Sequence, residues 1–167
     1  MQRRETWGRL TVYTDFSLRV LMFLALKGDR LATIAEVAKA YGISKNHLMK
    51  VTHQLGLAGY VKTVRGKGDG MRLAQPPENI VLGEVVRRTE PDMALVPCFA
   101  PDSTSCAIFP SCALRGALSN ARDAFLSALD GHTLADLVRP RAPLRKLLSF
   151  SPNDKAAAQT SRSARRA

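Results

Sequence analysis

The chain has 167 residues, 46% of them hydrophobic, and a formal net charge of +11, which suits one globular domain with a short additional segment. No run reaches the roughly 18 to 20 consecutive apolar residues of a membrane span. No apolar segment follows the basic residues Arg3, Arg4 and Arg9, so we expect no signal peptide. Three cysteines, an odd number, argue against a disulfide framework and favour a cytoplasmic protein.

Positive charge is concentrated in the two ends of the chain. Residues 1–75 hold thirteen Lys and Arg against five Asp and Glu, residues 76–140 five against eight, and residues 141–167 seven against one. A basic first half suits the phosphate backbone of nucleic acid, whose neutralisation releases counterions. A basic surface that is simply solvated explains the charge equally well, so sequence motifs must decide whether the chain binds nucleic acid.

Three helices are predicted in succession near the N-terminus, and a tight turn at Gly42 separates the second from the third. The expected caps are Thr14 for the first helix, Thr33 with Glu36 as a capping box for the second, and Ser44 for the third. The expected buried positions are Phe16, Val20, Phe23 and Leu24, then Ile34, Val37, Ala38 and Tyr41, then Leu48, Val51, Thr52 and Leu55. Helix, glycine turn and helix over residues 33–55 indicate a helix-turn-helix.

A β-hairpin is predicted directly after the third helix. Residues 60–65 are rich in β-branched and aromatic side chains, residues 66–70 are glycine-rich, and residues 71–73 return as a second strand. A hairpin in this place is a wing. We therefore predict a winged helix-turn-helix DNA-binding domain over residues 10–77, preceded by an extension of residues 1–9.

Residues 78–140 are predicted to hold two helices around an irregular segment. The first helix covers residues 78–90, and the second, over residues 113–129, carries an apolar stripe that is either core packing or a dimer interface. A last turn begins at Thr133, and residues 141–167 are expected to form a basic, disordered tail. The stripe consists of Leu114, Leu118, Ala121, Phe125 and Leu129. The predicted fold is mainly α, with a small β-hairpin wing and a long C-terminal dimerisation helix.

The third helix begins with polar side chains that suit base reading in the major groove. Asn46 can pair bidentately with adenine, and Lys45 and Lys50 can reach guanine or phosphates. His47 can donate or accept a hydrogen bond, although a solvated surface histidine explains it equally well. Ser44 is included among the DNA-binding residues but is expected first of all to cap the helix.

The predicted wing adds Arg65 and Lys67, which would lie over a neighbouring minor groove or phosphates. For each basic residue taken singly, a solvated charge is the alternative. As a set on one predicted surface, they favour double-stranded DNA.

The three cysteines, Cys98, Cys106 and Cys112, lie within fifteen residues of the irregular segment. Their spacing, C-x7-C-x5-C, lacks the close cysteine pair of zinc knuckles, and all three histidines are distant in the sequence. Wider spacing on a loop suits an iron–sulfur cluster held by thiolates. Three free thiols are the alternative. Because no Ser/His/Asp set, paired carboxylates or phosphate-binding glycine loop is found, no enzyme activity is indicated.

Several segments resemble the IscR/NsrR family of winged-helix iron–sulfur regulators, and the resemblance covers residues 10–138. The segments are TDFSLR (residues 14–19), GISKNH (42–47), VRGK (64–67) and CALR (112–115). Residues 90–96, 124–126, 129–130 and 133–137 are similar to the branch of the family that senses nitric oxide.

The resemblance implies that Cys98, Cys106 and Cys112 bind an iron–sulfur cluster, either 4Fe–4S or 2Fe–2S. The fourth ligand it implies is Asp15, donated by the partner subunit. Members of the IscR type use a histidine three residues after the third cysteine, where this chain has Arg115. That difference argues against an IscR-type site.

The resemblance also implies a homodimeric repressor that binds a palindromic operator and responds to nitric oxide. Alternatives are an iron-responsive regulator of the same fold, an iron–sulfur redox carrier of a different class, and a thiol-switch or zinc-stabilised regulator. Asp15 has a simpler explanation, since an acidic first turn complements the helix dipole and Arg19 stands four residues later. The chain departs from the family pattern at Asp69 in the wing and in residues 1–9.

Overall fold

The computed structural model describes residues 10–64, 66, 69–100 and 106–150. The α-helices are α1 (Val12–Lys27), α2 (Ile34–Tyr41), α3 (Lys45–Leu57), α4 (Leu82–Thr89), α5 (Ala113–Asp130), α6 (Leu134–Leu137) and α7 (Arg141–Leu147). The strands are β1 (Val61–Val64) and β2 (Gly70–Leu73), and short 3-10 turns cover Pro77–Asn79, Pro97–Phe99 and Phe109–Ser111. The predicted fold class, mainly α-helical with a winged helix-turn-helix, is confirmed.

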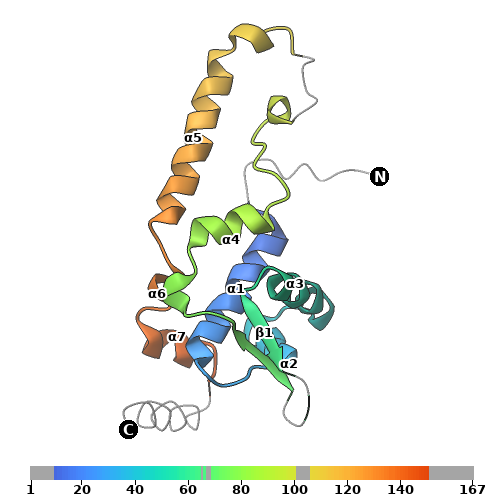
Figure 1. Cartoon of the computed structure of the whole chain (residues 1–167), viewed down its shortest axis with the longest axis vertical. Helices are drawn as coiled ribbons and strands as arrows, with labels where there is room; N and C mark the ends of the chain where they lie inside the picture. Colours follow the sequence, from blue (N-terminus) through green and yellow to red (C-terminus); the bar gives the residue numbers. More distant parts are fainter. Residues whose placement is uncertain (1–9, 65, 67–68, 101–105, 151–167) are drawn as a thin grey trace.

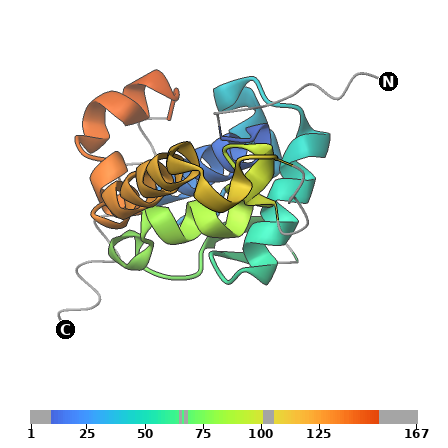
Figure 2. The same cartoon turned by 90° about the horizontal axis from the view of Figure 1, so that it is seen from above.

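Helix α1 is the centre of the molecule. Figures 1 and 2 show α2, α3 and the hairpin to one side of α1, α6 and α7 to the other, and α5 extending away from this body. Because elements pack on several sides of α1, its second half is buried almost all round rather than on the single predicted face. The core contains buried residues of α1 and of the elements packed around it. Among them are Val20, Leu21, Leu24 and Leu26 of α1 and Leu48, Leu55, Ile80 and Leu134 from other elements.

The wing is an antiparallel pair in which Val61 lies opposite Leu73. Met71 is buried, and it exchanges backbone hydrogen bonds of 2.9 and 2.8 Å with Ala32, which precedes α2. This bridge holds the wing against the helix-turn-helix. Strand β1 is shorter than the predicted residues 60–65, and β2 begins one residue before the predicted residues 71–73, but both strands lie where the sequence placed them.

Most predicted helix caps are confirmed. Glu36 and Thr33 form the capping box of α2, and Ser44 accepts a hydrogen bond from the His47 N–H at 3.4 Å. Gly42, with φ of 66°, has the left-handed conformation that glycine adopts without strain.

The predicted cap of α1 is wrong. Thr11, not Thr14, is the N-cap, and its hydroxyl accepts the Thr14 N–H at 3.2 Å. The Thr14 hydroxyl is buried and donates to Thr89 at 2.9 Å. Both threonines suit a cap, and a tertiary contact decides between them.

The helix predicted over residues 78–90 starts later, at Leu82. The preceding backbone pairs with the start of α6 instead: the Leu134 N–H donates to the Ile80 carbonyl at 2.8 Å, and Val81 bridges Thr133. Extended backbone at this point excludes the helix.

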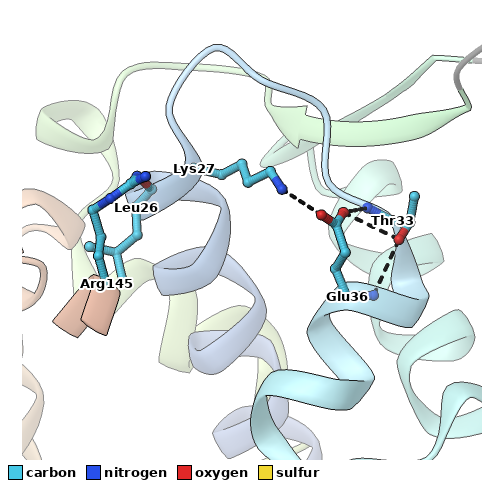
Figure 3. Close-up of polar contacts among 5 residues, drawn as sticks. All are labelled: Leu26, Lys27, Thr33, Glu36 and Arg145. Atoms are coloured by element: carbon cyan, nitrogen blue, oxygen red, sulfur yellow. Dashed lines mark hydrogen bonds and ion pairs between the residues drawn. The ribbon is translucent and has the colours of Figure 1, made fainter. Parts of the chain in front are cut away.

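Disorder predicted from residue 141 is wrong for residues 141–150. Arg141 Nη2 donates to the Ala25 carbonyl at 2.7 Å, and Arg145 Nη1 donates to the Leu26 carbonyl at 2.5 Å. Figure 3 shows Arg145 beside Leu26 at the end of α1. Carbonyls in the last turn lack partners within the helix and form the negative end of its dipole, so they attract arginine. Composition alone does not reveal this contact.

The predicted N-terminal extension and residues 151–167 lie outside the described residues. In the part of the chain that the structure covers, no helix combines the length and apolar content needed to cross a membrane.

Candidate DNA-binding surface and cysteine segment

Helix α3 presents its polar first turns outward. Ser44 caps the helix, and Lys45, Asn46, His47 and Lys50 are all exposed. The opposite face is buried by Leu48, Val51, Thr52 and Leu55, as the sequence predicted. The structure therefore brings together the five residues predicted on this helix, on the side away from the core.

His47 has a neighbour that the sequence did not indicate. Its ring centroid lies 6.0 Å from that of Phe16 in α1, with the two ring planes tilted by 41°. The histidine is exposed but lies against another helix, so a freely solvated side chain describes it incompletely.

The wing places two basic residues directly opposite each other. Lys62 in β1 faces Arg72 in β2, and both side chains are exposed. Neither forms an ion pair or hydrogen bond with another residue that the structure describes. Like charges directly opposite on a sheet are destabilising. Sequence reasoning missed this pair because strand register decides it.

Arg65 and Lys67, which the sequence placed in the wing, lie outside the described residues. The wing turn beside them is closed by a hydrogen bond from the Gly66 N–H to the carboxylate of Asp69. The residue that departs from the family pattern thus has a local structural role.

The three cysteines occupy separate positions in the described part of the segment. Cys98 lies in a 3-10 turn, Cys106 is exposed, and Cys112 is the residue before α5. All three are free thiols. Among the described residues, no three metal-ligating side chains gather into a site. The predicted ligand set therefore stays a prediction.

Two arginines of α5 hold the cysteine segment along that helix. The guanidinium of Arg122 lies 5.3 Å from the ring centroid of Phe99, next to Cys98, and Arg115 lies 4.7 Å from that of Phe109. Such cation–π contacts stabilise exposed sites modestly. Arg115 therefore has a role in packing the loop.

Asp15 lies in the first turn of α1, as predicted. Both of its carboxylate oxygens are 3.0 Å from Arg19 Nε, and about half of the Asp15 side chain is exposed. The i,i+4 pair that the sequence offered as a simpler explanation is therefore formed.

The start of α1 is bonded to the end of α4, where the cysteine segment begins. The Thr11 N–H donates to Glu90 Oε1 at 2.8 Å, and the Thr14 hydroxyl donates to Thr89. These partners are 75 to 79 residues apart in the sequence, so no local pattern predicts them. They connect the helix that carries Asp15 to the segment that carries the cysteines.

The donor set suits an iron–sulfur cluster. Thiolates are the usual protein ligands of such clusters, and the segment offers three thiols that no disulfide occupies. The carboxylate of Asp15 is accessible, although Arg19 pairs with it.

Residues 10–140 match the Rrf2 family, described as an iron-dependent transcriptional regulator. The chain belongs to the Rrf2 family. It is therefore a transcriptional regulator and not an enzyme, as predicted.

The match covers almost the full length of the curated relatives. The chain is 50% identical over 143 residues to the HTH-type transcriptional regulator NsrR of Bacillus subtilis, covering 85% of this chain and 98% of the relative. It is 49% identical over 142 residues to the NsrR of Bacillus licheniformis, covering 84% and 99%. The predicted resemblance to the IscR/NsrR family is confirmed.

Solved structures support the same fold. CymR, the global cysteine regulator of B. subtilis, is 27% identical with a TM-score of 0.63, covering 77% of this chain and 95% of that one. The IscR of T. potens, at 21% identity and a TM-score of 0.64 over 82% and 90% of the two chains, shares the fold.

Proposed function

We propose that the chain is a cytoplasmic, homodimeric transcriptional repressor whose binding to DNA depends on an iron–sulfur cluster and responds to nitric oxide. The observation that carries the proposal is that one chain joins an exposed polar recognition helix to a segment with three free thiols. Half of the aligned residues are identical to a regulator named NsrR, which supports the same reading.

The DNA contacts would come from α3 and the wing. In a dimer, two recognition helices reach successive major grooves about 34 Å apart, which suits a palindromic operator. Asn46 would read a base edge, while Lys45 and Lys50 would contact guanine or phosphates. Lys62 and Arg72 would add phosphate contacts at the wing, because a polyanion relieves their mutual repulsion.

A dimer interface is supported by the exposure of α5. None of its residues is buried in the single chain, and Leu114 and Phe125 of the predicted stripe are 63% and 43% exposed. An apolar stripe on an 18-residue helix favours burial against a second copy.

Cys98, Cys106 and Cys112 would hold the cluster, with the partner subunit's Asp15 as the fourth ligand. When bound, the cluster supplies iron with which nitric oxide reacts. Asp15 lies on α1, and α1 contacts α3 and is bonded to the end of α4. A 10- to 100-fold change in DNA affinity requires a coupling of about 1.4–2.8 kcal/mol, which the loss of one carboxylate bond between subunits can supply.

Anaerobic purification of the full chain tests this proposal. Iron and sulfide are counted, an absorption spectrum is recorded before and after nitric oxide, and DNA affinity is measured on a duplex that the protein selects from a random pool. Asp15→Ala should bind the cluster less firmly and lose its response to nitric oxide, while Asp29→Ala, at another exposed acid near α1, should behave as wild type. A metal-free protein that binds the duplex equally well contradicts the proposal.

Iron sensing is a second candidate, favoured by the description of the family as iron-dependent. It predicts that an iron chelator releases the duplex whereas a stoichiometric amount of nitric oxide does not. The two treatments, applied to the same preparation, separate the candidates.

A further inference from the structure

An ion pair links the end of α1 to the start of α2. Lys27, the last residue of α1, has 6% of its side chain exposed, and its Nζ lies 2.5 Å from Glu36 Oε1. The other oxygen, Oε2, accepts the Thr33 backbone N–H at 2.7 Å and the Thr33 hydroxyl at 3.2 Å (Figure 3). One carboxylate therefore closes the capping box of α2 and ties this helix to the end of α1.

The carboxylate of Glu36 is charged at neutral pH. Burial acts to raise the pKa of Glu36, but hydrogen bonds from Lys27 and Thr33 outweigh it and hold the pKa below its ordinary value. Charge-assisted hydrogen bonds are short and directional. Because Lys27 is nearly buried, removing its partner leaves an ammonium group that water solvates poorly.

The C-terminal segment, residues 141–150, covers Lys27, the nearly buried partner of this pair. The ring centroid of Phe150 lies 4.7 Å from that of Phe23, and Lys27 Nζ lies 5.8 Å from the Phe150 centroid. The guanidinium of Arg145 lies 4.8 Å from the same ring while it donates to a carbonyl of α1. Phe150 thus lies close to both cations, and its ring is one of the groups packed around the nearly buried Lys27.

The pair also bears on the position of the recognition helix. Helix α2 packs against α3, and the Ile43 N–H donates to the Ala38 carbonyl at 3.2 Å across the turn that joins them. Helix α3 also packs against α1 and β1, so we expect a change in the angle of α2 to shift the start of α3, which follows the turn, rather than the whole helix. Base contacts need an accurately placed helix, whereas attraction to phosphates is tolerant of geometry.

We infer that Lys27 and Glu36 are positioning residues that set the angle of α3 on its operator, and that residues 141–150 are the cover that maintains them. The inference rests on the proposed DNA-binding function. It goes beyond it by giving the C-terminal segment a part in sequence recognition.

Glu36→Gln separates positioning from charge. Glutamine retains an acceptor for the capping box but loses the attraction to Lys27. Since the variant removes a negative charge from a basic module, electrostatics alone predicts unchanged or tighter DNA binding. Positioning predicts the opposite: at least tenfold weaker binding to the duplex selected by the wild type, with binding to a scrambled duplex changed less than twofold.

Matched variants control for stability and for the cover. Thr33→Ala weakens the cap of α2 but keeps both charges, so its ratio of selected to scrambled affinity should stay near that of the wild type. Phe150→Ala should lower this ratio several-fold, whereas Leu147→Ala, at a side chain that is 78% exposed on α7, should not. All affinities are measured on the full chain at a temperature where circular dichroism shows each variant folded.

Each arm has a result that overturns the inference. Positioning by the ion pair is refuted if Glu36→Gln leaves the ratio of selected to scrambled affinity unchanged. It is also refuted if Thr33→Ala lowers this ratio as much as Glu36→Gln does. If Phe150→Ala and Leu147→Ala have equal ratios of selected to scrambled affinity, residues 141–150 have no part in sequence recognition through Phe150. A wild-type protein that selects no sequence is a different failure, because it contradicts the proposed function itself.

Discussion

Replacing Lys62 and Arg72 together by glutamine should make the free protein more stable and its DNA binding weaker. The two residues lie directly opposite each other in the wing, and both are exposed. Two effects of opposite sign from the same double variant are difficult to explain except by a cationic site that binds an anion.

The magnitudes follow from the register. Opposed residues have Cβ atoms about 5 Å apart, and like charges at the ends of the two long side chains can move farther apart, so the repulsion of about 0.8 kcal/mol for unit charges at about 5 Å in water is an upper bound. Salt and side-chain motion reduce this value, so we expect a gain of about 0.5 kcal/mol in the free energy of unfolding. For DNA, the loss of two phosphate contacts should make the slope of log affinity against log salt shallower by about 1.8.

Urea unfolding measures the first effect, and titration of a fluorescent duplex at several salt concentrations measures the second. Arg139→Gln, which removes an exposed positive charge two residues after α6, is the control and should change the salt slope little. The reasoning is refuted if the double variant is less stable than the wild type, or if its salt slope equals that of the control.

Three further predictions concern the core, the dimer and pH. Thr89→Val should cost about 1 kcal/mol in urea unfolding, since it removes the acceptor of the buried Thr14 hydroxyl; equal or greater stability would contradict this. Phe125→Glu should convert a dimer into a folded monomer, as measured by light scattering, whereas Ser127→Glu on the opposite face of α5 should leave the mass unchanged; a dimeric Phe125→Glu would contradict the interface. Because the pKa of Glu36 is lowered on folding, its charge stabilises the protein above the ordinary carboxyl pKa, and this contribution is lost as pH falls through the folded pKa. The advantage in melting temperature of wild type over Glu36→Gln should therefore be full at pH 7 and shrink as the pH falls below the ordinary carboxyl pKa, and an advantage that stays constant in acid would contradict the assignment.

The candidate site was predictable to different degrees. The exposed start of α3 follows from local signals, because the Ser44 cap and the apolar spacing together decide which side chains face outward. The like-charged pair in the wing was missed, since a shift of strand register changes every opposed pair. Arg145 was assigned to a disordered tail because its acceptor is a backbone carbonyl 119 residues away.

By itself, the sequence determined the order and kind of the elements from α1 to α6, the caps of α2 and α3, and the crowding of the cysteines. These depend on interactions within a few residues, such as the bond between Thr33 and Glu36. Only the tertiary structure decided which threonine caps α1, which basic residues oppose each other in the wing, and that residues 141–150 fold back onto α1. The physical reason is that each of these outcomes depends on a partner distant in the chain. Several local choices are nearly equal in energy, and one tertiary contact selects among them.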